Sequence, residues 1–164
     1  MSVEIKLRSP LLLIVCTGNV CRSPMVEAQF IHYMKMAGLA GTVISRGLAA
    51  PVGRPPHPYA REVAAARGVP IAPEKRAASV TSAEMAAATA IFVMEGSHRL
   101  EIQRKYPTAS GKTFLVGQWE SNEIPDPINM DISAFESAWS LGEAGVQSWI
   151  GKLESAGVLS HDAA

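Results

Sequence analysis

The segment "CTGNVCRS", residues 16–23, contains the side chains that covalent phosphate chemistry requires. It follows the apolar run "LLLIV" and precedes Pro24, which suits the first turn of a helix. Between a strand and a helix N-terminus, backbone N–H groups lack intrahelical partners and can bind a tetrahedral oxyanion. Gly18 and Asn19 tolerate positive φ in such a loop. Arg22 adds a planar fork that can hold two phosphate oxygens.

Cys16 would be the nucleophile of this loop. A thiol at a helix N-terminus and near an arginine ionises readily, so the loop favours a Cys16 thiolate. The Ser23 hydroxyl could donate a hydrogen bond to it. A nucleophile and a phosphate cradle in one loop are what phosphoryl transfer through phosphocysteine requires.

Three plainer interpretations compete with this one. A lone cysteine at a strand end is most often a small buried hydrophobe. A metal site would need more ligands, but the chain has only 2 cysteines and its 4 histidines show no ligand spacing. A Walker-type nucleotide loop would need Gly-Lys-Ser/Thr, which is absent. Because arginine, serine, glycine and asparagine occur together here, we expect a phosphate site that holds no metal or cofactor.

Asp126 is the candidate general acid. Breaking a phosphate ester requires a proton for the leaving group, and hydrolysis of phosphocysteine then requires a base for water. Asp126 lies between two prolines in "NEIPDPINM", and their rigidity would fix the loop that presents the carboxylate. Taken alone, this fragment could equally be an ordinary Pro-Asp-Pro turn.

Alternating patterns of strand and helix must position these residues. The apolar periodicity predicts strands over 11–15, 42–45, 90–94 and 113–116. It predicts helices over 24–38, 58–67, 82–88, 97–105 and 133–153. Such alternation implies right-handed βαβ units, so we expect one α/β domain with a four-stranded parallel sheet flanked by helices on both faces. Ligands of such sheets bind at the carboxyl ends of the strands, where the phosphate-binding loop after strand 1 lies.

The composition is that of one globular domain. The chain has 164 residues, of which 48% are hydrophobic and 18% charged. Its 15 basic and 15 acidic residues give a net charge of +0, so nothing favours nucleic acid as a partner. No apolar run is long enough for membrane insertion, and the N-terminus lacks the order of a signal peptide. We therefore expect a cytoplasmic protein with reduced thiols, and flexible segments at 1–9 and 157–164.

The string "VCTGNVCRSP", placed directly after an N-terminal strand, resembles the low-molecular-weight protein tyrosine phosphatases over about residues 10–155. The resemblance implies that Cys16 is the nucleophile, that Arg22 binds phosphate and the transition state, and that Asp126 acts as general acid and then base. The implied phosphate-binding loop consists of Thr17, Gly18, Asn19, Val20, Cys21 and Ser23. Ser45 matches a serine that supports this loop in the family.

Two further expectations depend on the same resemblance. The string "GQWESNEIPDP" resembles the bacterial branch associated with tyrosine kinases of capsule and exopolysaccharide synthesis. It implies a phosphotyrosine protein as substrate, with a bacterial tyrosine autokinase as candidate, and a monomer or weak self-association. Cys21 is either a small packing residue or, by resemblance, a redox partner that protects Cys16 through a reversible disulfide.

The sequence also departs from the family pattern. Ile128, Asn129 and Met130 stand where an aromatic residue is common after Asp-Pro, and residues 48–52 are aliphatic where another aromatic is common. Family members often have a histidine before the third strand that supports the asparagine of the loop, here Asn19. This sequence has no histidine evident there, and Lys75 lies nearest to that position. Thr17 is polar where leucine is common.

Three other functions are compatible with this scaffold. Thioredoxin-coupled arsenate reductases need further cysteines downstream, and this chain has none after Cys21. Protein arginine phosphatases resemble the same family but carry threonine at the position of Val20, where an aliphatic residue favours an aryl group. A non-catalytic phosphotyrosine-binding module would not need Cys16, Arg22 and Asp126 together. The sequence therefore favours a tyrosine phosphatase.

Overall fold

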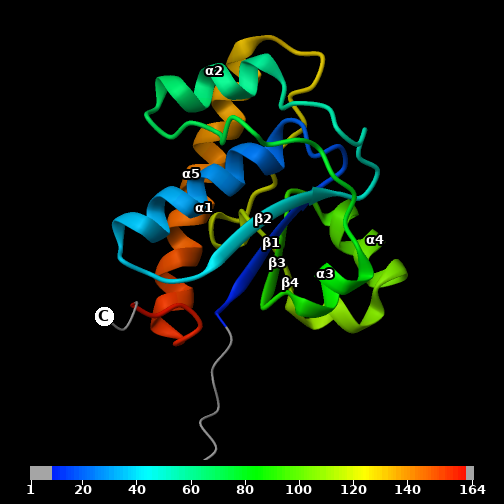
Figure 1. The fold of residues 1–164 in the computed structure, drawn as a ribbon, viewed down its shortest axis with the longest axis vertical. Coiled ribbons are helices and arrows are strands. Elements are labelled where there is room, and N and C mark those ends of the chain that lie inside the picture. The colour runs from blue at the N-terminus through cyan, green and yellow to red at the C-terminus, as the bar shows by residue number, and fades with distance from the viewer. Residues whose placement is uncertain (1–8, 162–164) are drawn as a thin grey trace, which may run out of the picture.

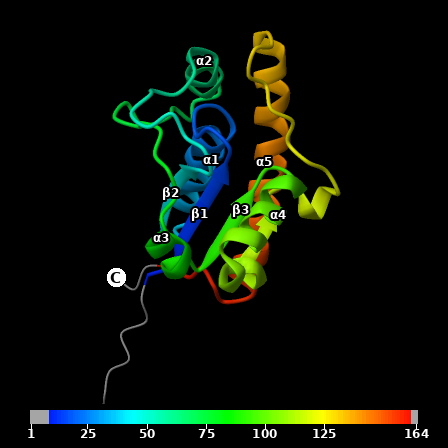
Figure 2. The same ribbon diagram turned by 90° about the vertical axis from the view of Figure 1, so that its right-hand side faces the viewer.

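A four-stranded parallel sheet forms the centre of the molecule. In the computed structural model, which describes residues 9–161, the strand order is β2-β1-β3-β4. The strands are β1 (Leu11–Cys16), β2 (Thr42–Gly47), β3 (Ala90–Val93) and β4 (Thr113–Leu115). Figure 2 shows β1 and β3 side by side and running in the same direction, toward the end of the molecule where α2 lies. The predicted α/β fold with a four-stranded parallel sheet is therefore confirmed.

Helices cover both faces of this sheet (Figure 1). Helices α1 (Arg22–Met36) and α5 (Ile132–Ser155) pack on one face, and α2 (Pro58–Ala66) packs on these two helices. Two shorter helices, α3 (Ser82–Ala87) and α4 (Gly96–Lys105), pack on the other, together with the 3-10 turn η1 (Pro107–Lys112). A second 3-10 turn, η2 (Gln118–Glu120), follows β4. Because alternate residues of β1 point to opposite faces and both faces are covered, the strand is apolar throughout.

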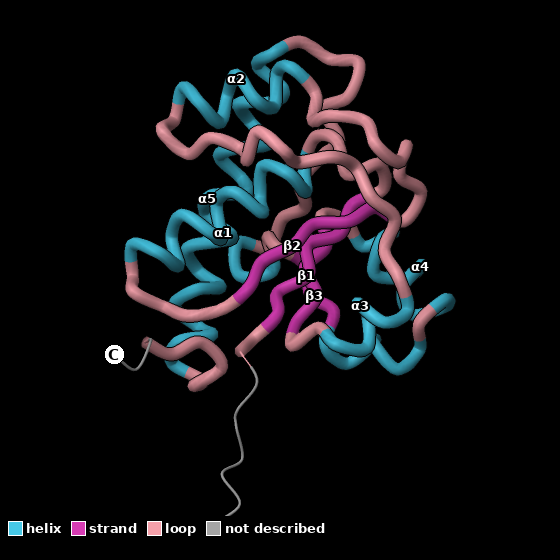
Figure 3. Tube along the Cα trace, in the orientation of Figure 1, coloured by secondary structure: helices cyan, strands magenta, loops and turns pink. Residues whose placement is uncertain are grey.

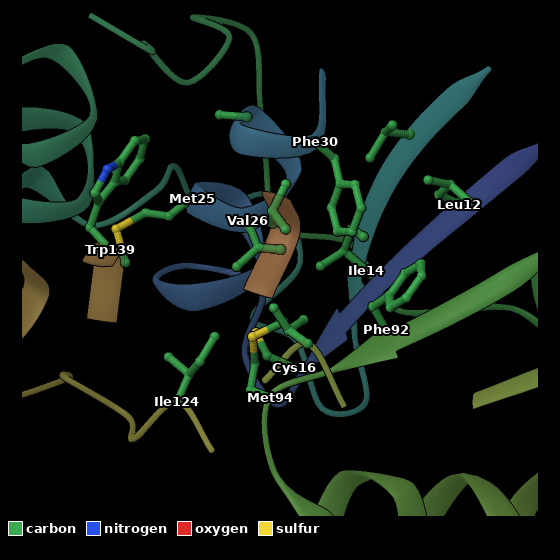
Figure 4. Close-up of a cluster of buried hydrophobic side chains, with 14 of the residues drawn as sticks. Leu12, Ile14, Cys16, Met25, Val26, Phe30, Phe92, Met94, Ile124 and Trp139 are labelled. Atoms are coloured by element: carbon green, nitrogen blue, oxygen red, sulfur yellow. The ribbon is translucent and has the colours of Figure 1, made fainter. Parts of the chain in front are cut away.

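The larger core extends from the outer helices to the phosphate loop. Phe30 of α1 packs on Phe92 of β3 with ring centroids 5.0 Å apart. Cys16, Met94 and Ile124 belong to the same buried cluster, at the carboxyl end of the sheet (Figure 4). The loop is therefore built on a packed base, and connecting segments lie around the carboxyl ends of the strands (Figure 3, loops in pink).

The end of β2 is tied to the phosphate loop. The strand runs two residues further than predicted, and Gly47 pairs in register with Cys16. Leu48 N donates to Cys16 O at 3.0 Å, and Ala49 N donates to Thr17 O at 2.9 Å. A Cβ atom at Gly47 would lie 2.6 Å from Thr17 O, so this close approach requires glycine.

The described part of the C-terminal tail is packed, although a flexible tail was expected from residue 157. Leu159 is 1% exposed, and Ala40 N donates to Ser160 O at 2.9 Å. The apolar surface that Leu159 buries holds this segment against the chain that follows α1. The remaining residues of both predicted flexible segments, 1–8 and 162–164, lie outside the described part. Among the helices within residues 9–161, none has the length and apolar character needed to cross a bilayer.

Candidate active site

The loop between β1 and α1 curls around a small cavity. The cavity has a volume of about 130 Å³ and is lined by Cys16, Thr17, Gly18, Asn19, Val20, Cys21, Arg22, Asp126 and Ile128. Asn19 has a φ of 57°, whereas Gly18 does not have the positive φ that its residue type allowed. Helix α1 begins at Arg22 rather than at Pro24, because proline fits any position of the first turn. The structure thus gathers the predicted loop residues around one site of phosphate size.

Cys16 lies at the base of this cavity and is 3% exposed. Its Sγ accepts a hydrogen bond from Asn19 N at 3.2 Å and lies 2.9 Å from Ser23 Oγ. Asn19 Nδ2 donates to Ser23 Oγ at 2.8 Å, so the hydroxyl hydrogen of Ser23 is free to point at sulfur. Two donors can therefore converge on Sγ and hold it at the base of the cavity.

Asn19 is held by a buried network behind the loop. Its Oδ1 accepts from Ala78 N at 3.0 Å, and its Nδ2 donates to Ser45 Oγ at 3.0 Å. The predicted supporting serine therefore contacts Asn19. Lys75, the residue nearest to the missing histidine, does not reach Asn19 and donates instead to Ser45 O at 2.9 Å.

Glu27 completes this network and was missed by the sequence reasoning. Ser45 Oγ donates to Glu27 Oε2 at 3.2 Å, and Ser45 N donates to Oε1 at 3.1 Å. Burial raises the pKa of Glu27, and the nearby charge of Lys75 opposes that rise. A single glutamate within α1 carries no local signal for this role, because only the fold brings β2 beside it.

Arg22 is fixed at the other end of the loop and is 3% exposed. Its Nη1 donates to Glu95 Oε1 at 2.5 Å and to Ile124 O at 2.9 Å. Burial by itself would raise the pKa of Glu95, but the hydrogen bond and charge of Arg22 outweigh it and lower that pKa. Glu95 was also missed, although it lies two residues after the end of β3 and so emerges at the same edge of the sheet as Cys16.

Asp126 lies at the open end of the cavity with 43% of its side chain exposed. Its Oδ2 is 3.7 Å from Arg22 Nη2, and its Oδ1 accepts from Ile128 N at 3.1 Å. The second bond fixes the carboxylate within the proline-bounded turn. The group is accessible from solvent and borders the cavity, so it can exchange protons with a leaving group or with water.

Cys21 is a free, buried thiol within the same loop. Burial raises its pKa to about 12, and the charges of Asp126 and Cys16 act in the same direction. Cys21 is therefore a protonated thiol at neutral pH and is unsuited to be the nucleophile. Its predicted redox role remains a prediction.

His98 was not singled out from the sequence, yet it contacts the loop. Its Nε2 lies 3.1 Å from Thr17 Oγ1, and its Nδ1 accepts from Glu95 N at 3.2 Å. Burial, followed by the charge of Arg22, lowers the pKa of His98. The first turn of α4 thus reaches both the beginning and the end of the phosphate loop.

Comparison with protein families and comparison with individual proteins point to the same family. Residues 11–159 match the family described as low molecular weight phosphotyrosine protein phosphatase. The chain is 38% identical over 146 residues to the probable low molecular weight protein-tyrosine-phosphatase EpsP of Ralstonia nicotianae, covering 89% of this chain and 97% of that protein.

Two solved structures are similar to the whole domain. Wzb of Vibrio vulnificus, in complex with benzylphosphonate, superposes with a TM-score of 0.82 at 34% identity, covering 89% of this chain and 100% of that one. The arginine phosphatase YwlE of Geobacillus stearothermophilus gives a TM-score of 0.81 at 28% identity, covering 91% of this chain and 96% of that one. The fold is therefore shared by a protein in complex with benzylphosphonate and by a protein named as an arginine phosphatase.

Proposed function

The chain belongs to the low molecular weight phosphotyrosine protein phosphatase family, and from this premise we propose that it hydrolyses phosphotyrosine in proteins through a phosphocysteine intermediate. The observation that carries the proposal is the arrangement around one 130 Å³ cavity, with Cys16 at its base and Arg22 and Asp126 at its side and mouth. These positions suit an in-line displacement at a phosphorus atom held between them.

In the first step, the Cys16 thiolate attacks the phosphorus and the bond to the tyrosine oxygen breaks. The contacts from Ser23 and Asn19 hold the sulfur in place for this attack. Arg22 and the loop N–H groups stabilise the charge of the transferring phosphoryl group. Asp126 gives its proton to the departing phenolate, which leaves as neutral tyrosine.

In the second step, water attacks the phosphocysteine. Asp126, now a carboxylate, accepts a proton from that water, inorganic phosphate forms, and the thiolate is regenerated. The same carboxyl group therefore ends the cycle protonated, as it began.

Phosphoarginine is the second candidate substrate, because a solved neighbour is an arginine phosphatase. Val20 argues against it. Its aliphatic side chain lines the cavity and offers an apolar contact to an aryl ring but no hydrogen bond to a guanidinium. We therefore rank phosphotyrosine first.

Within this proposal the substrate is a phosphotyrosine protein of the cytoplasm, and a bacterial tyrosine kinase of polysaccharide synthesis is the expected partner. The support for this partner is the resemblance of residues 117–127 to the branch of the family associated with such kinases. Ile128, which lines the cavity and is 41% exposed, and Met130, two residues further along the chain and 59% exposed, offer apolar contact surface to a protein substrate in place of the missing aromatic residues.

The deciding experiment compares phosphotyrosine and phosphoarginine in peptides of the same sequence with the wild-type chain. We expect phosphotyrosine to give the higher kcat/KM, and acid quenching during turnover to trap phosphate on Cys16. A preference for phosphoarginine would replace the leading proposal with the second one, and binding without turnover of either would indicate a non-catalytic module.

A further inference from the structure

His98 contacts the phosphate loop from outside the cavity, through Thr17. Its Nε2 lies 3.1 Å from Thr17 Oγ1, and the histidine is only 3% exposed. The histidine side of this contact is therefore shielded from water. Thr17 itself is exposed and lies in the cavity wall, immediately after the nucleophile.

The direction of the hydrogen bond follows from the other ring nitrogen. Nδ1 accepts a bond from Glu95 N, so it carries no hydrogen in the neutral ring. The hydrogen is then on Nε2, and His98 donates to Thr17 Oγ1. Because burial and the charge of Arg22 lower the pKa of His98, this neutral tautomer persists at pH 7.

Thr17 is the point where the loop backbone begins to curl. Its carbonyl accepts from Ala49 N at 2.9 Å, and its hydroxyl accepts from His98, so two different elements hold the residue. At the far end of the loop, Glu95 holds Arg22. The N-terminal turn of α4 thus acts on both ends of the segment that surrounds the phosphate.

We propose that His98 is a positioning residue that, through Thr17, holds the backbone of the phosphate loop in its oxyanion-binding conformation. The inference rests on the proposed function, because this loop is the phosphate site of that reaction. Donors that are already in place need no reorganisation when charge develops, so a loop fixed in advance binds the transition state more strongly. His98 is not a catalytic residue, since it contacts Thr17 rather than the reacting atoms.

Two substitutions test the contact from its two sides. Thr17→Val removes the hydroxyl with little change of shape, and His98→Leu removes the donor. Each should weaken the binding of inorganic phosphate and lower kcat/KM for a phosphotyrosine peptide by about 3- to 10-fold, the effect of one neutral hydrogen bond. The double variant should lose no more than His98→Leu alone, because Thr17→Val removes only the contact that His98→Leu has already removed.

Conservative variants separate this role from a general effect on folding. Thr17→Ser keeps the hydroxyl that accepts the hydrogen bond, and His98→Gln keeps a donor of similar reach. Both variants should therefore retain phosphate affinity and kcat/KM within about twofold of wild type. Thr108→Val, at an exposed threonine of η1, is the matched control and should change neither quantity. Thermal unfolding of every variant shows whether it is folded, and if His98→Leu is not, Thr17→Val and His98→Gln carry the test.

Wild-type phosphate affinity and kcat/KM in Thr17→Val would overturn the inference. A double variant whose fold-loss equals the product of the two single fold-losses would also overturn it. So would a Thr17→Ser variant as impaired as Thr17→Val. Failure of the wild-type chain to hydrolyse phosphotyrosine would instead refute the proposed function. The phosphate titrations need no turnover, so they would still decide whether His98 acts on the loop through Thr17.

Discussion

Asp126 Oδ2 lies 3.7 Å from Arg22 Nη2, so the candidate acid and the candidate phosphate-binding arginine meet at the mouth of one cavity. The distance is longer than a hydrogen bond, and the carboxylate is held by Ile128 N rather than by the guanidinium. Asp126 can therefore change its protonation state during a reaction without releasing Arg22, which is anchored separately by Glu95.

From this arrangement we predict that Asp126→Asn lowers kcat on phosphotyrosine peptides by about 10²- to 10⁴-fold. The amide keeps the shape of the side chain but cannot donate a proton to a phenolate and regain it from water. The loss should shrink for aryl phosphates with more acidic phenols, because those leaving groups need less protonation. Steady-state kinetics over a series of substituted phenyl phosphates measures both effects.

Glu136→Gln, at an exposed position of α5, is the matched control for removal of a carboxylate and should leave kcat unchanged. A near-normal kcat for Asp126→Asn on phosphotyrosine would show that another group provides the proton.

The second prediction concerns the nucleophile. Cys16→Ser should abolish hydrolysis of aryl phosphates, because a serine hydroxyl in this loop has no adjacent base to ionise it. The side chain is small and buried, so the fold should persist, and binding of phosphotyrosine peptides should remain measurable by calorimetry. Residual turnover at the wild-type rate would exclude a phosphocysteine mechanism.

Much of this site follows from the local sequence, because the loop is continuous. Cys16, Arg22 and Ser23 lie within eight residues, and the types of the residues between them indicate a curled backbone. Local sequence does not specify which residue takes the positive φ. Asn19 does so rather than Gly18, because its buried amide must also reach Ser23 and Ser45.

The supporting residues could not be found in the same way. Glu27, Glu95 and His98 come from α1 and from the N-terminal end of α4, and only the strand order brings β2 and β3 beside β1. Once that order is known, a polar residue within two positions of the end of β3 becomes a candidate, since it emerges at the edge where Cys16 lies. Leu159 was missed because one leucine in a short tail forms no periodic pattern.

The third prediction tests the network behind the loop. Asn19→Ala should lower stability and kcat/KM together, because the amide makes three side-chain hydrogen bonds in a fully buried position. The backbone N–H of Ala78 and the hydroxyl of Ser45 would lose a partner, at a cost of about 1–3 kcal/mol each where they stay buried. Alanine also tolerates the positive φ of this position poorly.

Urea unfolding and peptide kinetics on the same preparations check this prediction. Ser45→Ala removes one of the three bonds of the Asn19 amide, together with the bond from Ser45 Oγ to Glu27, and should give a smaller loss of both quantities. An Asn19→Ala chain with wild-type stability would mean that the network contributes nothing to the fold.

The fourth prediction concerns oxidation of the loop. Peroxide should convert the Cys16 thiolate to a sulfenic acid, and the Cys21 thiol should then displace water from that sulfur to form a disulfide. Because the pKa of Cys21 is raised to about 12, this second step should be slow at pH 7 and faster at higher pH. Reductant should restore activity to the wild-type chain after mild oxidation.

In Cys21→Ser the sulfenic acid has no neighbouring thiol, so continued peroxide should drive Cys16 to irreversible oxidation. Full recovery of Cys21→Ser with reductant, after the same exposure, would contradict the protective role. Mass spectrometry of the peptide holding both cysteines distinguishes the disulfide from the higher oxides.

The last prediction concerns the pH dependence of stability at His98. Burial and the charge of Arg22 lower the pKa of His98 below its ordinary value of 6.5. As the pH falls below 6.5, the unfolded chain therefore takes up a proton at this site before the folded chain does. The stabilisation is fully present above about pH 6.5 and is lost as the pH falls toward the folded pKa, by at most about 1.4 kcal/mol per pH unit.

Urea unfolding of the wild-type chain and of His98→Gln from pH 7.5 to 5.0 measures this effect. The free energy of unfolding should depend less on pH in the variant, because glutamine does not titrate. Parallel curves for wild type and His98→Gln would show that His98 is protonated equally in both states.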